Sequence, residues 1–181
     1  MTATAAPLVG GEPEPGPSPD RVAFDVPSEP QPQGSSRAFR HRHTGRVMVT
    51  SDNARLRPWR DAVCWHARQA MHTPWLIGTV ARPPFEGPVA VVLEFRFARP
   101  AGHFGKRGLP PSAPSGHVVR PDLDKLVRAV LDALSEAGVW RDDAQVVSIA
   151  ARKAYGSAPG LTAEIVRSES LASPRVANDE G

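Results

Sequence analysis

Apolar and polar residues alternate along two segments of the chain, as they do in strands that have one face in a core. In residues 89–98 (VAVVLEFRFA), apolar side chains hold every second position from Val89, while Glu94 and Arg96 lie on the opposite face. Residues 21–26 (RVAFDV) alternate in the same way over a shorter length. We therefore expect one strand in each segment.

Two other segments carry apolar residues at helical spacing. Residues 122–137 (DLDKLVRAVLDALSEA) have a continuous apolar stripe, and Gly138 is suited to end the helix. A weaker stripe runs from Trp59 to about residue 72. Pro58 suits its first turn, because the N–H that proline lacks would have no partner there. We expect one helix in each segment.

The chain after the second predicted helix contains two alternating segments rich in β-branched residues, at 145–155 and 161–167. The short turn GSAPG between them predicts that they pair as a hairpin. The predicted order is therefore strand, helix, strand, helix, strand, strand. This order indicates an α+β fold, a single domain in which two helices pack on a mixed β-sheet with a C-terminal β-hairpin.

Long segments without periodicity separate and flank these elements. Residues 27–51 begin with prolines and become basic, which favours a loop. Residues 99–121 hold five prolines, four glycines, four basic residues and no acid, so we expect an inserted, mobile functional loop. The composition of residues 1–20 predicts a disordered tail and that of 171–181 a flexible one, which leaves 21–170 as the folded domain.

The charge and the cysteine content narrow the class of protein. Residues 21–170 contain 21 Lys and Arg against 14 Asp and Glu, a net charge of +7 that favours a polyanionic partner. Cys64 is the only cysteine, so one chain has no disulfide and no cysteine-rich zinc site. We find neither an apolar run of roughly 18 residues, which a membrane span needs, nor a leader-like start. We expect a cytoplasmic protein without membrane contact.

Basic side chains gather in two of the irregular segments. The densest group lies where acids are nearly absent, and consists of Arg37, Arg40, Arg42 and Arg46. Such a group is suited to binding DNA phosphates, although a solvated loop that is basic by chance has the same composition. Lys106 and Arg107 in the inserted loop offer a second place for contact with DNA.

Two pairs of acids lie on either side of the second predicted helix. Asp122 and Asp124 are at its start, while Asp142 and Asp143 precede the next strand. If the turn carries Asp143 back to the helix start, three carboxylates would form a hard-oxygen site for Mg²⁺ or Mn²⁺. Such an ion activates water and polarises a phosphodiester. Arg128, one turn beyond Asp124, could hold the phosphate.

Structural explanations exist for each of these residues. Asp122 can cap the helix, and acids in a first turn interact favourably with the helix dipole. Asp142 and Asp143 can shape a turn. Arg128 can pair with Asp124 or with Asp132, each four residues away. The spacing alone leaves these alternatives open.

The whole segment RPDLDKLVRAVLDALSEAGVWRDDAQV resembles the signature of the RusA endonuclease family. The resemblance runs without a gap from Arg120 to about Lys153, and the amino-terminal half matches more loosely. It implies a homodimer that cuts four-way DNA junctions with Mg²⁺, by paired nicks in opposing strands, during recombination and repair. The essential acids of the family fall on Asp122, Asp124 and Asp143.

Further positions match the family pattern, and two depart from it. Asp142, Gln145 and Lys153 match, and we expect Lys153 to contact DNA. Lys125 stands where the family usually has Asn, so it adds a charge that can contact DNA or tune metal affinity. Arg128 stands where the family usually has Lys. Arginine can bind phosphate but cannot donate a proton near neutral pH.

Two other functions fit the same residues. One is a less selective nuclease that acts on flaps, forks or single strands. The other is a DNA-binding relative with impaired catalysis, for which Lys125 and Arg128 leave room.

Overall fold

The computed structural model describes residues 20–34, 36–40, 42, 44–45, 47–51, 53–75, 78–114 and 116–168. Its helices are α1 (Leu56–Ala70), α2 (Leu123–Ala137) and the short 3-10 helices η1 (Ala101–His103) and η2 (Asp143–Gln145). Its strands are β1 (Arg21–Val26), β2 (Ser36–Arg40), β3 (Val47–Ser51), β4 (His72–Trp75), β5 (Gly78–Ala81), β6 (Val89–Ala98), β7 (Val146–Gly156) and β8 (Gly160–Arg167).

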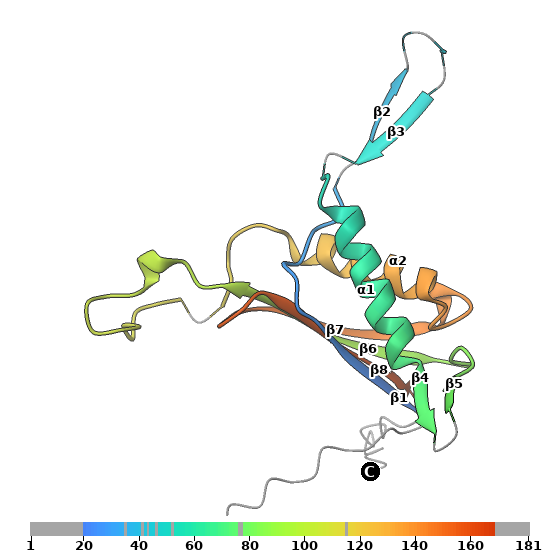
Figure 1. Cartoon of the computed structure of the whole chain (residues 1–181). Helices are drawn as coiled ribbons and strands as arrows, with labels where there is room; N and C mark the ends of the chain where they lie inside the picture. The colour runs from blue at the N-terminus through green and yellow to red at the C-terminus, as the bar shows by residue number, and fades with distance from the viewer. Residues whose placement is uncertain are drawn as a thin grey trace, which may run out of the picture.

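The main sheet has the strand order β1-β8-β6-β7. Strand β6 is antiparallel to β8 and parallel to β7, and β8 is antiparallel to β1, so the sheet is mixed. Both long helices lie over the same face of this sheet (Figure 1). The predicted α+β domain of two helices on a mixed sheet is therefore confirmed, and strand β6 has the predicted bounds.

The predicted C-terminal hairpin is wrong, because β7 and β8 are not neighbours. Strand β6 lies between them, and residues 157–159 connect β7 to β8 across the end of β6. The reason lies in the composition of β6, whose buried residues include Ala90 as well as the alternating apolar set. A strand this apolar is stabilised at the centre of a sheet, and the turn sequence carries no information about that placement.

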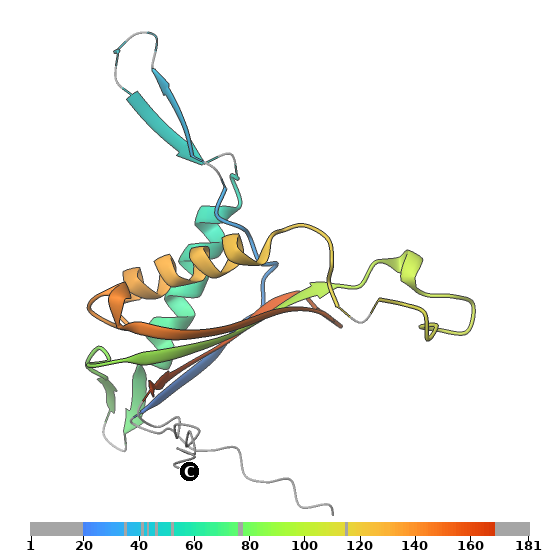
Figure 2. The same ribbon diagram turned by 180° about the vertical axis from the view of Figure 1, so that it is seen from behind.

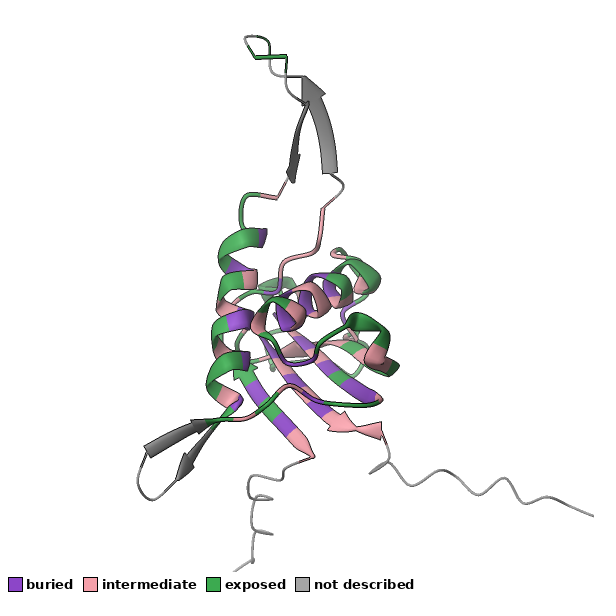
Figure 3. Cartoon of the chain, turned by 90° about the vertical axis from the view of Figure 1, so that its right-hand side faces the viewer, coloured by how far each residue is buried: buried purple, intermediate pink, exposed green. Residues whose placement is uncertain are grey.

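The core lies between the sheet and the two helices, where Figure 3 shows the buried positions on facing surfaces. Helix α1 buries Leu56, Trp59, Val63, Cys64 and Ala67. Helix α2 buries Leu126, Ala129, Val130, Ala133 and Leu134. Each buried Leu or Val side chain contributes roughly 1.5–3 kcal/mol, so these faces hold the helices on the sheet. Helix α1 begins two residues before Pro58, which lies in its first turn as expected.

Two small hairpins lie where the sequence predicted none. Strands β2 and β3 pair antiparallel within the predicted loop 27–51 and project beyond the start of α1 (Figure 1). Gly45, with φ of 65°, lies in their connection. Strands β4 and β5 pair after α1. Short strands with few apolar residues give too weak an alternation to be recognised in sequence.

The inserted loop 99–121 projects from the end of β6 and returns to the start of α2 (Figure 2). In its described residues, 99–114 and 116–121, the regular features are η1, a tight turn at residues 105–108 and an isolated bridge from Gly116 to Ala154 of β7. The predicted tails lie outside the described residues except for Asp20, whose Oδ1 is 2.9 Å from Nε of Arg167. Within the described part of the chain, no helix has the length and apolarity needed to cross a membrane.

Candidate active site

Asp122 occupies the N-cap position of α2 but does not cap the helix with its side chain. Its Oδ2 lies instead 2.9 Å from Nζ of Lys125. This ammonium, through its hydrogen bond and its charge, holds the pKa of Asp122 below its ordinary value. The side chain is half exposed. The carboxylate is thus ionised, accessible and not committed to the helix backbone.

Asp124 and Arg128 are both exposed on the first turns of α2. Neither forms an ion pair with a described residue, so the pairings of Arg128 with Asp124 or Asp132 are not made. Asp132 lies 3.7 Å from Arg60 of α1 instead. Asp124 and Arg128 therefore each present an exposed charged group, unpaired with any described residue, on the first turns of α2.

Lys153 of β7 holds the segment that leads into Asp122. Its Nζ donates to the backbone oxygens of Val119 and Pro121, at 2.7 Å each. The backbone N–H of Gln33 donates to the oxygen of Lys125 at 3.0 Å, which joins the segment before β2 to the first turn of α2. The start of α2 is therefore fixed from two sides, while its acids stay exposed.

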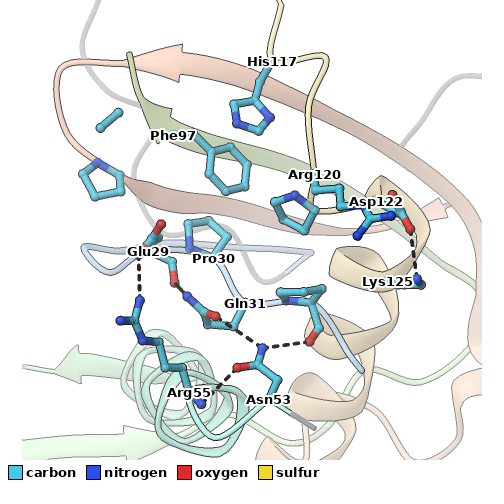
Figure 4. A pocket seen from close by; sticks show the side chains of 14 residues that line it. Glu29, Pro30, Gln31, Asn53, Arg55, Phe97, His117, Arg120, Asp122 and Lys125 are labelled. Carbon is cyan, nitrogen blue, oxygen red and sulfur yellow. Dashed lines mark hydrogen bonds and ion pairs between the residues drawn. The ribbon is translucent and has the colours of Figure 1, made fainter. Parts of the chain in front are cut away.

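A pocket of about 790 Å³ opens beside this helix start (Figure 4). It lies between the segment 29–32, the start of α1, the end of β6 and the start of α2, and Asp122 lines one side. Its other charged lining residues are Glu29, Arg55, Arg120 and Lys125. The volume falls in the range of small-molecule and cofactor sites, so it has room for part of a nucleic-acid strand.

His117, at the back of this pocket, is a residue whose importance the sequence did not reveal. Its ring is 8% exposed and stacks on Phe97 with centroids 4.1 Å apart. Burial, and then the nearby charge of Lys153, lower its pKa, so the ring is neutral at physiological pH. The only signal in the sequence was its place within the inserted loop.

The second pair of acids has a different environment. Asp142 accepts from the backbone N–H of Ala144 at 2.8 Å, in a capping box with Gln145. Gln145 also donates to the oxygens of Phe85 and Gly87, at 2.8 and 3.0 Å. Asp142 thus shapes the turn, which is the structural role considered for it from the sequence. Asp142 and Gln145 fix the entrance to β7.

Asp143 is exposed, and its Oδ1 accepts from the indole N–H of buried Trp140 at 2.9 Å. The hydroxyl of Ser135 contacts the same oxygen. Ser135 is in the last turn of α2, and its role at this site was not foreseen, because a serine on a helix surface gives no distinctive signal.

The structure does not bring Asp143 to Asp122 within one chain. Ser135, which contacts Asp143, is 13 residues beyond Asp122 along α2. At a rise of 1.5 Å per residue this is roughly 20 Å. Among the described residues no three His, Cys, Asp or Glu side chains gather as a metal site. A single chain offers Asp122 and Asp124 as hard-oxygen donors, without the third carboxylate.

The basic residues singled out in the sequence lie on two projections. Arg42 is exposed in the connection between β2 and β3, while Arg37 and Arg40 are in β2, where only the backbone is described. Arg46 lies outside the described residues. Lys106 and Arg107 are exposed at the turn of the inserted loop.

Exposed carboxylates are able to bind a divalent metal ion of the kind that assists phosphodiester hydrolysis. The family model described as Endodeoxyribonuclease RusA matches residues 27–166, which include both long helices and strands β6 and β7. The chain belongs to this family, and its class is that of nucleases that hydrolyse DNA internally. A search of curated proteins finds no match.

Proposed function

We propose that the chain is a Mg²⁺-dependent endonuclease that resolves four-way DNA junctions by paired nicks, in recombination and repair. The observation that carries the proposal is the start of α2. There, Asp122 and Asp124 are exposed, and the side chain of Asp122 does not cap the helix. Asp122 lines a pocket together with the basic residues Arg55, Arg120 and Lys125 and the acid Glu29. In a chain of this family, we assign such carboxylates to the reaction, because the side chain of Asp122 makes no hydrogen bond that caps the helix.

Asp122 and Asp124 would hold the ion, with Asp143 of a second copy as the third ligand. Mg²⁺, or Mn²⁺ in its place, would supply an activated water and neutralise charge on the phosphate. The residues of the chain bind and orient the strand: Arg128 donates two parallel hydrogen bonds to the phosphate oxygens. Because arginine stays protonated, it stabilises charge and moves no proton.

A homodimer built on β7 would bring the separated acids together. Strand β7 is at the edge of the main sheet, and among the described residues only the isolated bridge between Ala154 and Gly116 pairs with its outer side. The strand also exposes Val147 and Ile149, near its start, at 59% and 45%. A sheet edge with exposed apolar side chains is a ready surface for pairing with another strand. Strand β6, in contrast, is central in the sheet and pairs on both sides.

The direction of β7 supports this pairing. Asp143 precedes the first residue of β7, whereas Lys153, near its end, contacts the segment before Asp122. Residues 146 and 153 are roughly 23 Å apart in an extended strand, close to the separation of Asp143 from Asp122. If two copies pair β7 antiparallel about a twofold axis, the start of one strand meets the end of the other. Asp143 of one copy then approaches Asp122 of its partner, twice.

Two cuts in opposing strands need two such sites, and a twofold dimer provides them. The four-way junction is favoured over flaps and forks because it has the same symmetry when folded. The exposed cations Arg42, Lys106, Arg107, Lys125 and Arg128 would bind its phosphates, with Arg37 and Arg40 of β2 and with Arg46. A catalytically impaired DNA-binding protein would bind the same DNA without cutting it.

The test compares three labelled substrates: a four-way junction, a linear duplex of the same sequence, and a fork, each with and without Mg²⁺. We expect paired nicks in the junction only, and only with the metal. Equal cutting of the fork would support the less selective nuclease. Tight junction binding without any cut, with either Mg²⁺ or Mn²⁺, would contradict the enzymatic function.

A further inference from the structure

The inserted loop contains a tight turn that displays two basic side chains. Gly105 and Gly108 exchange backbone hydrogen bonds, N to O at 2.8 and 3.1 Å, and so close a two-residue turn at Lys106 and Arg107. Gly108 has φ of 98°, which other residues rarely adopt. Such closed two-residue turns hold their side chains in fixed directions. We call residues 104–109 the wedge turn.

Exposed apolar side chains flank the two cations. Phe104 is 52% exposed and Leu109 is 50% exposed, one on each side of the turn. Neither side chain packs on the hydrophobic core. Large apolar side chains exposed together at the tip of a projection indicate a contact with a partner.

The base of the loop is firmly attached to the end of the sheet, although its tip projects (Figure 2). Nη1 of Arg99 donates to the oxygen of Pro114 at 2.8 Å, and its guanidinium lies 4.3 Å from the centroid of the Tyr155 ring. The rings of His103 and His117 also contact Tyr155, with centroids 5.3 and 5.1 Å away. The tip is therefore presented from a fixed base.

The charge of the loop selects the partner. Residues 99–121 contain four Lys and Arg and no acid, so the partner is a polyanion. A lipid surface would satisfy the cations too, but both ends of the loop border the pocket that Asp122 lines. DNA is the polyanion that reaches this pocket in the proposed reaction.

We propose that the wedge turn inserts Phe104 and Leu109 between base pairs at the branch point of the DNA. Lys106 and Arg107 then bind the phosphates on either side. Apolar side chains inserted at a base step unstack it, and the base pairs at a branch point lack the continuous duplex that flanks other steps. The proposal rests on the proposed function and adds to it the element that distinguishes branched from linear DNA.

The position of the loop connects insertion to cleavage. The loop leaves β6 after Ala98 and enters α2 at Asp122, and residues at both of these ends line the pocket. A strand displaced by the wedge turn would run along the loop into the pocket beside Asp122. Insertion would thus place a strand near the branch point at the carboxylates.

The experiment uses the full chain without divalent metal, on a four-way junction that carries 2-aminopurine at the branch point. Unstacking raises the fluorescence of this base. We expect the double variant Phe104→Ala, Leu109→Ala to abolish most of the rise. Junction binding should weaken about fivefold or more, as for the loss of one stacked base, while binding to linear duplex changes less than about twofold. Phe104→Trp should keep the signal.

Two further variants separate the roles within the loop. Trp65→Ala removes a surface aromatic of similar exposure (58%) from α1 and should change neither signal. Lys106→Ala with Arg107→Ala should lower the slope of binding against salt by roughly two units, while the fluorescence rise persists at saturating protein. The apolar pair then provides insertion and the cations provide affinity.

The outcomes separate the two proposals. If the wild-type chain binds and cuts the junction but the double variant of Phe104 and Leu109 behaves like wild type, the wedge turn is overturned and the proposed function stands. If wild type binds no branched DNA, the proposed function fails and the wedge turn fails with it. Selective binding of anionic vesicles through Phe104 and Leu109, without a fluorescence change on the junction, would assign the turn to a membrane surface.

Discussion

At the scale of single residues, the acids at the start of α2 differ from ordinary helix caps in what their side chains contact. Asp122 turns away from the helix backbone toward Lys125, and Asp124 contacts no described partner. A cap replaced by another residue costs about 1 kcal/mol of stability. Because Asp122 makes no capping bond, its replacement should affect function more than folding.

Lys125 would compete with a metal for the carboxylate of Asp122. Its Nζ lies 2.9 Å from Oδ2, where a bound cation would also lie. We therefore predict that Lys125→Asn binds Mg²⁺ up to about fivefold more tightly, as expected from the energy of an exposed ion pair. Calorimetric titration of the protein with Mg²⁺, without DNA, measures this. Asp132→Asn, which removes an acid further along α2, is the matched control, and weaker Mg²⁺ binding by Lys125→Asn would contradict the competition.

Arg128 is predicted to act on the phosphate. Arg128→Ala should lower the cleavage rate at least about 100-fold, a loss typical of removing one group that stabilises the transition state. Arg128→Lys should keep most of the rate, because it keeps the charge at the family's usual residue. Single-turnover cleavage of the junction is the measurement. Full activity of Arg128→Ala would show that Arg128 has no role in cleavage and is only an exposed charge on the helix.

At the scale of elements, the attachment of the inserted loop to β6 and β7 depends on a neutral histidine. Burial first, and the charge of Lys153 second, hold the pKa of His117 below its ordinary value of 6.5. Above pH 6.5, both the folded and the unfolded chain keep this ring neutral. As the pH falls below 6.5, the unfolded chain takes up the proton first, so the free energy of unfolding decreases.

His117→Phe should remove this dependence and keep the stack on Phe97. Between about pH 7 and about pH 5.5 the melting temperature of the wild type should fall more than that of the variant, because one proton changes stability by at most about 1.4 kcal/mol per pH unit. The other five histidines are present in both chains, so the difference between the two curves isolates His117. Parallel curves would show that His117 titrates as it does in the unfolded chain.

The elements that were predicted well from the sequence are those with a clear pattern of apolar and polar residues within their own length. Helix α2 has a continuous stripe and a left-handed Gly138 at its end, so its bounds were recognisable. Strand β6 alternates over ten residues. The partners of a strand are determined elsewhere: GSAPG predicted that β7 and β8 would pair, but the core places β6 between them.

At the scale of the whole molecule, the placement of the four acids also depends on long-range packing rather than on local pattern. Their order along the chain predicted two pairs near α2, but not the distance between the pairs. A helix of 15 residues moves the chain roughly 20 Å, and the turn after it is too short to return. The return is made by β7, which begins only after Asp143. The carboxylate of Asp143 therefore stays at the far end of α2. The number of residues between the acids does not show where the chain turns back, and so could not reveal this separation.

The proposed site, shared between two copies of the chain, leads to a prediction that differs from the one for a site within a single chain. Asp122→Asn and Asp143→Asn should each nearly abolish cleavage in a homodimer while junction binding remains, because one charge of a three-carboxylate site is lost and the basic surface is unchanged. In a mixed dimer, one composite site carries both substitutions and the other carries neither. The intact site has Asp122 from the Asp143→Asn chain and Asp143 from the Asp122→Asn chain. Co-expression of the two variants should therefore restore nicking.

The product of the mixed dimer is also specified. With one site working, a junction receives a single nick in place of two paired nicks, which a denaturing gel distinguishes from full resolution. Light scattering on the same sample should give twice the chain mass of 19.4 kDa. A mixture of Asp122→Asn with Asp124→Asn is the control, because these acids belong to the same side of the site and each composite site then carries one substitution. No nicking in the Asp122 and Asp143 mixture at the dimer mass would contradict the shared site. Nicking in the control would show that Asp122 and Asp124 do not belong to the same side of one site.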